Sequence, residues 1–440
     1  MHRRRQHQPW SNWSRTVRCE VVHHAHPVNV EQIQAEVLRA AEEGERIRVV
    51  GSGASFSPLC WTDENHLSLE RFTGIESVDV ERRRVWVRGG TPLRRLSEAL
   101  AERGLALEIA PDFDQMTIAG AISTASHGSG ATFGNLATLV TGLRMVCSDG
   151  SVQQVSPATE PERFEAACVS LGALGVITHV ELQCVDDYRL AVASRRTTLG
   201  TALATLEQLR RDHRNTELFW FPYADAVIVR EFDPTRELPP RLMPARHALR
   251  RGIEGRVFRA MSSVARHAPR LTEPLAGLIA SRVANRHEVL HAREAYPIRR
   301  YSRFQQLEYA LPVDALGDAL KSLNKLIKAL DLRIHFPLEV RFVRGDRFWL
   351  SPHYGRDSAC ITVPAYADMA FDAYFAPIAD ILERHDGRPH LGMVHDRGAD
   401  ELRGMFPRFD DFCRMRRDCD PNGVFLNPHL AGLFGEALDR

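Results

Sequence analysis

The sequence lacks the features that identify membrane, secreted and nucleic-acid-binding proteins. No apolar run of about 18 residues occurs in the 440-residue chain, so no membrane span is predicted. The basic N-terminus is not followed by an apolar stretch, and a secretory signal is therefore not expected. Because the formal net charge is only +1, the chain has no overall attraction for nucleic acid, and we expect no such partner. These absences favour a cytoplasmic location.

Patterns typical of disulfides, metal sites and hydrolases are also absent. The eight cysteines are scattered without a Cys-x-x-Cys pair, which favours buried thiols in a reducing compartment. His390 and His395 are close in sequence, but Pro389 and Gly392 argue against a helix that would align them. We therefore predict no metal. No Gly-x-Ser-x-Gly motif occurs, so a hydrolase has little support.

What remains is the composition of a globular protein with two or three domains. Hydrophobic residues make up 44% of the chain and charged residues 26%. A helix at 29–43 and a strand at 47–50 begin a mixed α+β region. From about residue 186 the predicted strands contain more aromatic residues. The Arg-rich stretch at 241–290 is either a set of helices with a solvated basic face or a docking surface. Its shortage of aromatics argues against single-stranded nucleic acid.

Two segments rich in glycine and hydroxyl residues are the most informative features. Glycine allows positive φ and leaves backbone N–H groups open to a phosphate. The first segment alone is also compatible with an ordinary tight turn, and its spacing is not G-x-G-x-x-G. Together the two segments predict a long ligand that carries a pyrophosphate. The residues concerned are Val50, Gly51, Ser52, Gly53, Ala54, Ser55 and Phe56 in the first segment, and Gly120, Ser123, Thr124, His127, Gly128, Ser129 and Gly130 in the second.

An acid and a base stand two residues apart in a later strand-like run. Glu339 and Arg341 alternate with apolar residues over 336–342. The period of two places both charged side chains on one face of a strand. One interpretation is an exposed ion pair. The other is the wall of a pocket, in which the arginine fork holds hydroxyl or carbonyl oxygens.

These segments resemble the flavin-dependent aldonolactone and alditol oxidase group of the vanillyl-alcohol-oxidase superfamily. That group includes gulonolactone, galactonolactone and arabinonolactone oxidases or dehydrogenases. The resemblance extends over nearly the whole chain, and no single motif in it would be specific. The segments that carry it include 49–58, 118–130, 171–178, 339–341 and 420–428.

The resemblance implies an α+β fold with a two-part PCMH-type FAD-binding domain and an α+β cap domain that holds the substrate. The expected parts are an N-terminal extension at 1–20, the FAD-binding domain at 21–186, and the cap domain at 187–395. The cap carries the basic helical insert at about 241–290, and a C-terminal segment at 396–440 returns to the flavin side.

The resemblance also implies roles for particular residues. Both glycine-rich segments are expected to bind FAD. The remaining expected FAD contacts are Gly175, Val176, Ile177 and Asn427. The expected catalytic residues are Glu339, Arg341, His390 and His395.

The chemistry implied by the resemblance is hydride transfer from a hydroxyl-bearing carbon of a sugar-derived lactone or polyol to flavin N5. The small-molecule substrate is then released oxidised, and O2, giving H2O2, or another acceptor reoxidises the flavin. Two alternatives stay open. One is a dehydrogenase that passes electrons to a quinone or a protein, and the other is a flavin-binding protein that has lost catalysis. The oligomeric state is also open.

Two positions depart from the pattern of the group. Many relatives carry a covalently linked histidine where this chain has Ala54, so we predict that FAD is bound non-covalently. Met393 replaces the lysine of the His-Trp-Gly-Lys motif, and a thioether cannot donate a hydrogen bond. Either His395 or Arg341 then supplies the missing charge, or the substrate is less polar.

Overall fold

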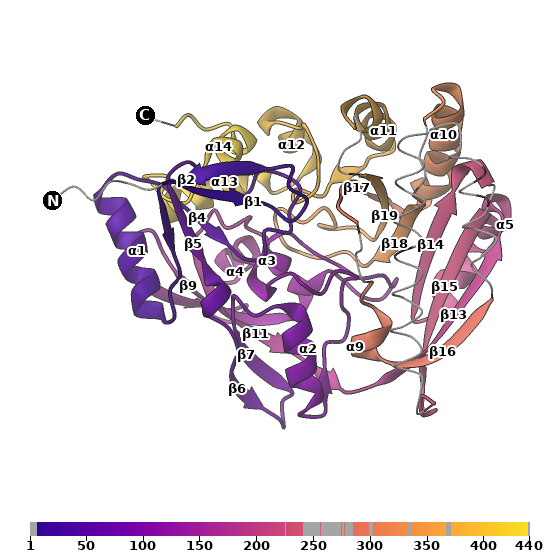
Figure 1. Ribbon diagram of the computed structural model, residues 1–440, viewed down its shortest axis with the longest axis horizontal. Coiled ribbons are helices and arrows are strands. Elements are labelled where there is room, and N and C mark those ends of the chain that lie inside the picture. The colour runs from indigo at the N-terminus through magenta and orange to yellow at the C-terminus, as the bar shows by residue number, and fades with distance from the viewer. Residues whose placement is uncertain are drawn as a thin grey trace.

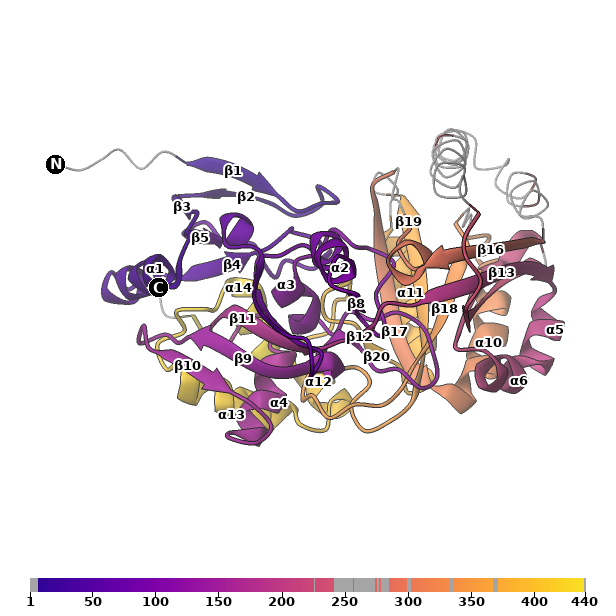
Figure 2. The same ribbon diagram turned by 90° about the horizontal axis from the view of Figure 1, so that it is seen from below.

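The computed structural model describes residues 7–224, 226–240, 285–298, 302–332, 336–366 and 371–438, together with residues 256, 274 and 277. The fold is α+β, and its two halves lie side by side along the long axis of the molecule (Figures 1 and 2). Most of the basic stretch predicted at 241–290 lies outside the described residues. Within the described residues, no helix combines the length and the apolar character needed to cross a bilayer.

The N-terminal half contains two main sheets. The parallel sheet has the order β3 (His23–Ala25), β5 (Asn65–Ser68) and β4 (Ile47–Val50). The antiparallel sheet has the order β10 (Val152–Val155), β9 (Val140–Val146), β11 (Val176–Gln183), β7 (Arg84–Arg88) and β6 (Ile75–Asp79). Two small pairs are β1 (Gln8–Ser11) with β2 (Arg18–Val21), and β8 (Leu105–Ala106) with β12 (Val185–Asp186).

Helices from both ends of the chain pack on these sheets. The helix at the start of the chain confirms the sequence prediction, because the side chain of Asn29 caps it and Ile33, Val37 and Ala40 are buried. The last helices return to this half, so the indigo N-terminal segments and the yellow C-terminal helices lie together in Figure 1. These helices are α1 (Val30–Glu42), α2 (Leu93–Ala101), α3 (Ile118–Ser123), α4 (Pro161–Cys168), α12 (Ala399–Met405), α13 (Phe409–Cys419) and α14 (Pro428–Phe434).

The second half is built on an eight-stranded antiparallel sheet, with one face covered by helices (Figure 2). Its strands, in spatial order, are β16 (Arg286–His291), β13 (Arg189–Thr197), β15 (Ala226–Thr235), β14 (Asn215–Phe221), β18 (Leu338–Val343), β19 (Ser358–Tyr366), β17 (Phe304–Pro312) and β20 (Arg388–Pro389). The covering helices are α5 (Leu199–Ala204), α6 (Leu206–Asp212), α10 (Leu316–Ala329) and α11 (Asp372–Arg384), and α9 (Ala292–Ala295) follows β16. Short 3-10 helices are η1 (Leu69–Arg71), η2 (Leu136–Leu139), η3 (Pro222–Ala224) and η5 (Val313–Ala315).

Side chains alternate strictly across the eight-stranded sheet. On β18, Leu338, Val340 and Phe342 pack in the apolar core beneath the helices. Glu339 and Arg341 lie on the opposite face, where Arg341 contacts the N-terminal half. The prediction that the two charged side chains share one face is therefore confirmed, and that face is buried.

A buried arginine joins loops that are far apart in the sequence. Arg48 on β4 is 2% exposed, and its guanidinium donates hydrogen bonds to the carbonyl oxygens of Leu59 (2.8 Å), Leu171 (2.9 Å) and Phe425. Burial lowers the pKa of Arg48 to about 10, which leaves it charged at neutral pH. One cation thus holds the loop after the first glycine-rich segment, the 171–172 turn and the C-terminal segment together.

We expect Arg48→Gln to lower the free energy of unfolding by at least about 3 kcal/mol, because it leaves buried carbonyls without donors at about 1–3 kcal/mol each. Urea or thermal unfolding measures the change. The matched control is Arg94→Gln on α2, whose exposed pair with Glu98 contributes only about 0.3–0.5 kcal/mol. Equal losses in the two variants would contradict the role assigned to Arg48.

Candidate active site

A cavity lies between the two halves of the molecule. Its empty volume is about 1430 Å³, with the solvent at its mouth included. Its lining runs from residues 51–56 of the N-terminal half to Arg341 on the eight-stranded sheet, so the cavity is shared by both halves. Most of the residues predicted from the sequence line it. They are Gly51, Ser52, Gly53, Ala54, Ser55, Phe56, Gly120, Ser123, Thr124, His127, Gly175, Ile177, Arg341 and His390.

The other predicted residues lie outside the lining of the cavity. The end of the second glycine-rich segment pairs with the eight-stranded sheet: the N–H of Gly130 donates to the carbonyl of Phe342 (2.7 Å), and the Ser129 hydroxyl accepts from the N–H of Phe342 (3.2 Å). These contacts serve the junction between the halves, so the sequence-based assignment of these two residues to FAD lacks structural support. The residues outside the lining are Val50, Gly128, Ser129, Gly130, Val176, Asn427, Glu339 and His395.

Two of these residues have clear alternative roles. The side-chain amide of Asn427 donates to the carbonyls of Pro58 (2.9 Å) and Trp61 (2.7 Å), so it supports the loop after the first glycine-rich segment. The ring of His395 lies 6.0 Å from that of His429, outside the cavity lining, and burial lowers the pKa of His395 to about 3. This position and this neutral ring give no support to His395 as a replacement for the charge of the missing lysine.

The first glycine-rich segment keeps its backbone donors unpaired. No hydrogen bond from the N–H groups of residues 52–55 occurs within the described part of the chain. Its carbonyls, by contrast, are held by the N-terminal residues: the N–H of Trp13 donates to Gly53 (2.7 Å), and the amide of Asn12 donates to Ser55 (3.0 Å). A loop with free N–H groups beside a cavity fits an anionic group such as the pyrophosphate of FAD.

Arg341 sits in the cavity wall among three carboxylates. Its Nη2 lies 2.7 Å from Asp112 and 2.8 Å from Glu339, and its Nε lies 3.5 Å from Glu217. Burial opposes the charge of the guanidinium, but Asp112, Glu339 and Glu217 raise its pKa well above the ordinary value. The carboxylates therefore fix both the charge and the orientation of Arg341. Sequence reasoning missed Asp112, because only the fold brings that segment to β18.

A second buried ion pair lies on the same face of the sheet. His127 Nε2 is 3.1 Å from Glu308 Oε1, and the Thr362 hydroxyl donates to Glu308 Oε2 (2.7 Å). Burial opposes both charges. Even so, Cys360 and Glu308 raise the pKa of His127 well above its ordinary value, and His127 holds that of Glu308 well below its own. Sequence reasoning did not assign Glu308 to the site, and its alternation with apolar neighbours on β17 was the signal that could have found it.

His390 offers a donor to the cavity, because the backbone fixes its tautomer. The N–H of Gly392 donates to His390 Nδ1 (3.1 Å), so the neutral ring carries its proton on Nε2. Burial lowers the pKa of His390, which keeps the ring neutral. This geometry suits a hydrogen-bond donor and does not suit a general base.

Aromatic rings form an apolar wall of the cavity. The ring of Trp13 lies 5.2 Å from that of Phe304 and 5.5 Å from that of Phe113, and the rings of Phe56 and Phe304 are 5.8 Å apart. Met393 also lines the cavity. Where the resemblance places a lysine, this chain therefore presents an apolar side chain to the ligand.

Comparisons with known proteins agree with this geometry. The profile of a family described as D-arabinono-1,4-lactone oxidase matches residues 180–433, and that of an FAD binding domain matches residues 23–156. An L-gulono-1,4-lactone dehydrogenase of Mycobacterium tuberculosis (strain ATCC 25618 / H37Rv) is 34% identical over 426 residues, which cover 97% of this chain and 99% of the relative. An L-gulonolactone oxidase of Scyliorhinus torazame is 30% identical, covering 97% and 98%. An alditol oxidase of a Streptomyces species is 28% identical, covering 96% and 98%.

Solved structures share the overall fold. Cholesterol oxidase from Brevibacterium sterolicum aligns with a TM-score of 0.76 at 15% identity, covering 98% of this chain and 97% of that chain. A structure described as a solvent-stable cholesterol oxidase aligns with a TM-score of 0.80 at 15% identity, covering 97% of each chain. At this identity the likeness shows the fold and carries no information on the substrate.

We expect the buried pair of His127 and Glu308 to give stability a distinctive pH dependence. The lowered pKa of Glu308 stabilises the fold above the ordinary Glu value of about 4.3, and this is lost as the pH falls. The raised pKa of His127 stabilises the fold below the ordinary His value of about 6.5, and this is lost as the pH rises through the raised value. Glu308→Gln should therefore cost about 3–5 kcal/mol near pH 5, and less as the pH rises.

Chemical unfolding of the wild type and of Glu308→Gln between pH 5 and pH 9 measures this difference. Glu98→Gln, which breaks the exposed pair with Arg94 on α2, serves as the control and should show a small difference that does not depend on pH. If the difference for Glu308→Gln stayed constant across the range, Glu308 would not be stabilising a positive charge on His127.

Proposed function

Because the chain belongs to the D-arabinono-1,4-lactone oxidase family, we propose that it is an FAD-dependent oxidoreductase that oxidises a CH–OH group of a sugar-derived lactone or polyol. One observation carries the proposal: a single cavity joins the unpaired N–H groups of residues 52–55 to the buried guanidinium of Arg341. Relatives similar over nearly their whole length are named for L-gulono-1,4-lactone, L-gulonolactone and alditols, which all carry such groups.

The residues present fit FAD. The N–H groups of residues 52–55 would hold the pyrophosphate, and the Ser123 hydroxyl, which lines the same cavity, would add a donor. The nitrogens of His127 are engaged by Gly128 and Glu308, so this residue would offer only its ring surface and backbone to the cofactor. FAD, when bound, accepts the hydride that leaves the hydroxyl-bearing carbon.

The side chains of the cavity would orient the substrate and stabilise charge. Arg341 would donate to the reacting oxygen and favour the alkoxide that develops there, while Asp112 and Glu339 hold the guanidinium in place. His390 would add a second donor from Nε2. The aromatic wall would exclude water from the reacting atoms.

The acceptor that reoxidises the flavin separates two versions of this proposal. The relative with 34% identity is named a dehydrogenase, and the relative with 30% identity is named an oxidase. O2, giving H2O2, would serve an oxidase, and a quinone or protein would serve a dehydrogenase.

All eight cysteines are free, which supports a reducing compartment such as the cytoplasm.

Arg341→Ala should slow reduction of the bound flavin about 10²–10³-fold, the loss typical of removing one donor to a developing oxyanion. Anaerobic stopped-flow mixing with L-gulono-1,4-lactone and with xylitol would follow bleaching of the oxidised flavin. Arg195→Ala, which breaks a half-exposed pair with Glu231 on the same sheet, is the control and should keep the wild-type rate. If lactones and polyols leave the wild-type flavin oxidised, the protein does not have the proposed activity.

Acid precipitation should release the flavin into the supernatant, because Ala54 lines the cavity at the position of the linking histidine and has no nucleophile. Absorption spectra of the supernatant and the pellet measure the distribution, with a covalent flavoprotein treated in parallel as the reference. Flavin that stays in the pellet would show that another residue forms a link.

A further inference from the structure

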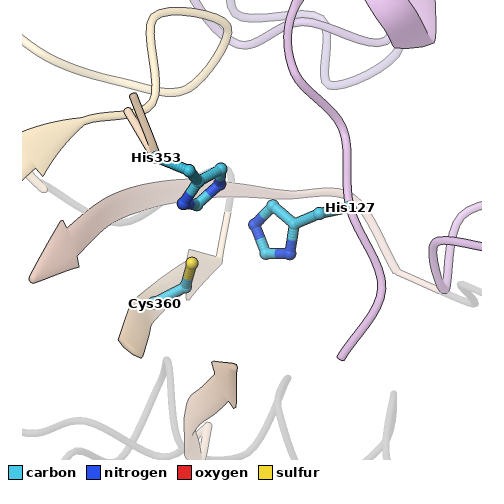
Figure 3. A group of neighbouring side chains, drawn as sticks. All are labelled: His127, His353 and Cys360. Carbon is cyan, nitrogen blue, oxygen red and sulfur yellow. The ribbon is translucent and has the colours of Figure 1, made fainter. Parts of the chain in front are cut away.

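Three buried side chains of metal-binding type meet beside the cavity, and the proposed oxidation does not use them together. They are His127 from the N-terminal half, His353 from the loop before β19, and Cys360 from β19. Figure 3 shows the three side chains pointing toward one another, and one ligand atom of each lies within 4.8 Å of those of the other two. Their exposures are 5%, 0% and 0%. This group is called the His–His–Cys cluster below.

His353 has no hydrogen-bond partner for its ring. Among the described residues, neither Nδ1 nor Nε2 finds one, although the side chain is fully buried. A buried polar group without a partner costs free energy, and native structures rarely keep one without a bound species to satisfy it. The unpartnered ring of His353 therefore indicates that the His–His–Cys cluster binds a ligand.

His127 is oriented as metal-bound histidines are. Its Nδ1 donates to the carbonyl of Gly128 (2.8 Å), so Nε2, which pairs with Glu308 Oε1 (3.1 Å), is the nitrogen that would coordinate the metal in place of that pair. Histidines that bind metals almost always donate their other ring N–H to a carbonyl or a carboxylate in this way. The Oε1 of Glu308 lies 3.1 Å from the same Nε2, so a carboxylate also stands next to the cluster.

We propose that His127, His353 and Cys360 bind a divalent zinc ion. Two imidazoles and a thiolate match the preference of zinc for nitrogen and sulfur ligands. The ion would reach the cluster through the cavity, which His127 and Glu308 both line. Since the ligands come from both halves, the bound ion would link the halves next to the proposed active site.

Zinc content tests the proposal directly. The FAD-bound protein, prepared without a metal-binding tag, is dialysed against ZnCl2 and then against metal-free buffer, and zinc per chain is measured by mass spectrometry. We expect one zinc ion per wild-type chain and a loss of at least tenfold in zinc affinity for Cys360→Ala and for His353→Gln. Bound zinc should also raise the unfolding temperature of the wild type.

Two buried residues elsewhere supply matched controls. Cys168 on α4 is fully buried, and His66 on β5 is fully buried with its Nε2 bonded to the carbonyl of Cys60 (2.7 Å). Cys168→Ala and His66→Gln should keep the zinc of the wild type. A wild-type protein that retains no zinc, or controls that lose as much zinc as the cluster variants, would overturn the proposal.

X-ray absorption at the zinc edge decides the matter if the cluster variants fail to fold. For the wild type we expect one sulfur neighbour at about 2.3 Å and nitrogen neighbours at about 2.0–2.1 Å. A shell of oxygen and nitrogen without sulfur would show zinc bound elsewhere and would overturn the assignment. Neither measurement depends on turnover, so failure here is distinguishable from failure of the proposed oxidation.

Discussion

Two buried ion pairs connect the halves of the molecule, and the site depends on both. Arg341 of β18 pairs with Asp112 of the N-terminal half, and Glu308 of β17 pairs with His127. Each half thus supplies one acid and one base. A buried charge that loses its partner costs about 3–5 kcal/mol, so these pairs fix how the polar face of the sheet meets the glycine-rich segments. The cavity is the space that this docking leaves open.

The pleat of the eight-stranded sheet places the charged and polar side chains of the proposed site on that polar face. The alternation that buries Leu338 and Val340 under helices presents Arg341 to the cavity. Strand register then sets the neighbours, because Arg341 pairs with Cys360 across β18 and β19, and Thr362 pairs with Glu308 across β19 and β17. The oxidation site and the His–His–Cys cluster are therefore adjacent on one face, and a metal bound in the cluster would act on the position of His127 in the cavity wall.

The first glycine-rich segment owes its free donors to contacts made by its carbonyls and by the loop that follows. The N-terminal residues hold the carbonyls of Gly53 and Ser55, while Asn427 holds the loop at 58–61. The expected N-terminal extension is thus in contact with the proposed cofactor site. Ala54 and Met393 lie in the same cavity, so both departures from the family pattern act where cofactor and substrate would bind.

The sequence by itself determined the glycine-rich segments, the alternation around Glu339 and Arg341, and the family, because these depend on residues close together in the chain. It could not exclude Ser129 or Asn427 from the lining, since backbone pairing with β18 and support of a loop are contacts between distant segments. The sequence also gave no reason to place Asp112, Glu308 or Cys360 at the site. Tertiary structure alone brings such residues together, because strand register and the docking of the two halves decide which side chains meet and which charges are buried in pairs.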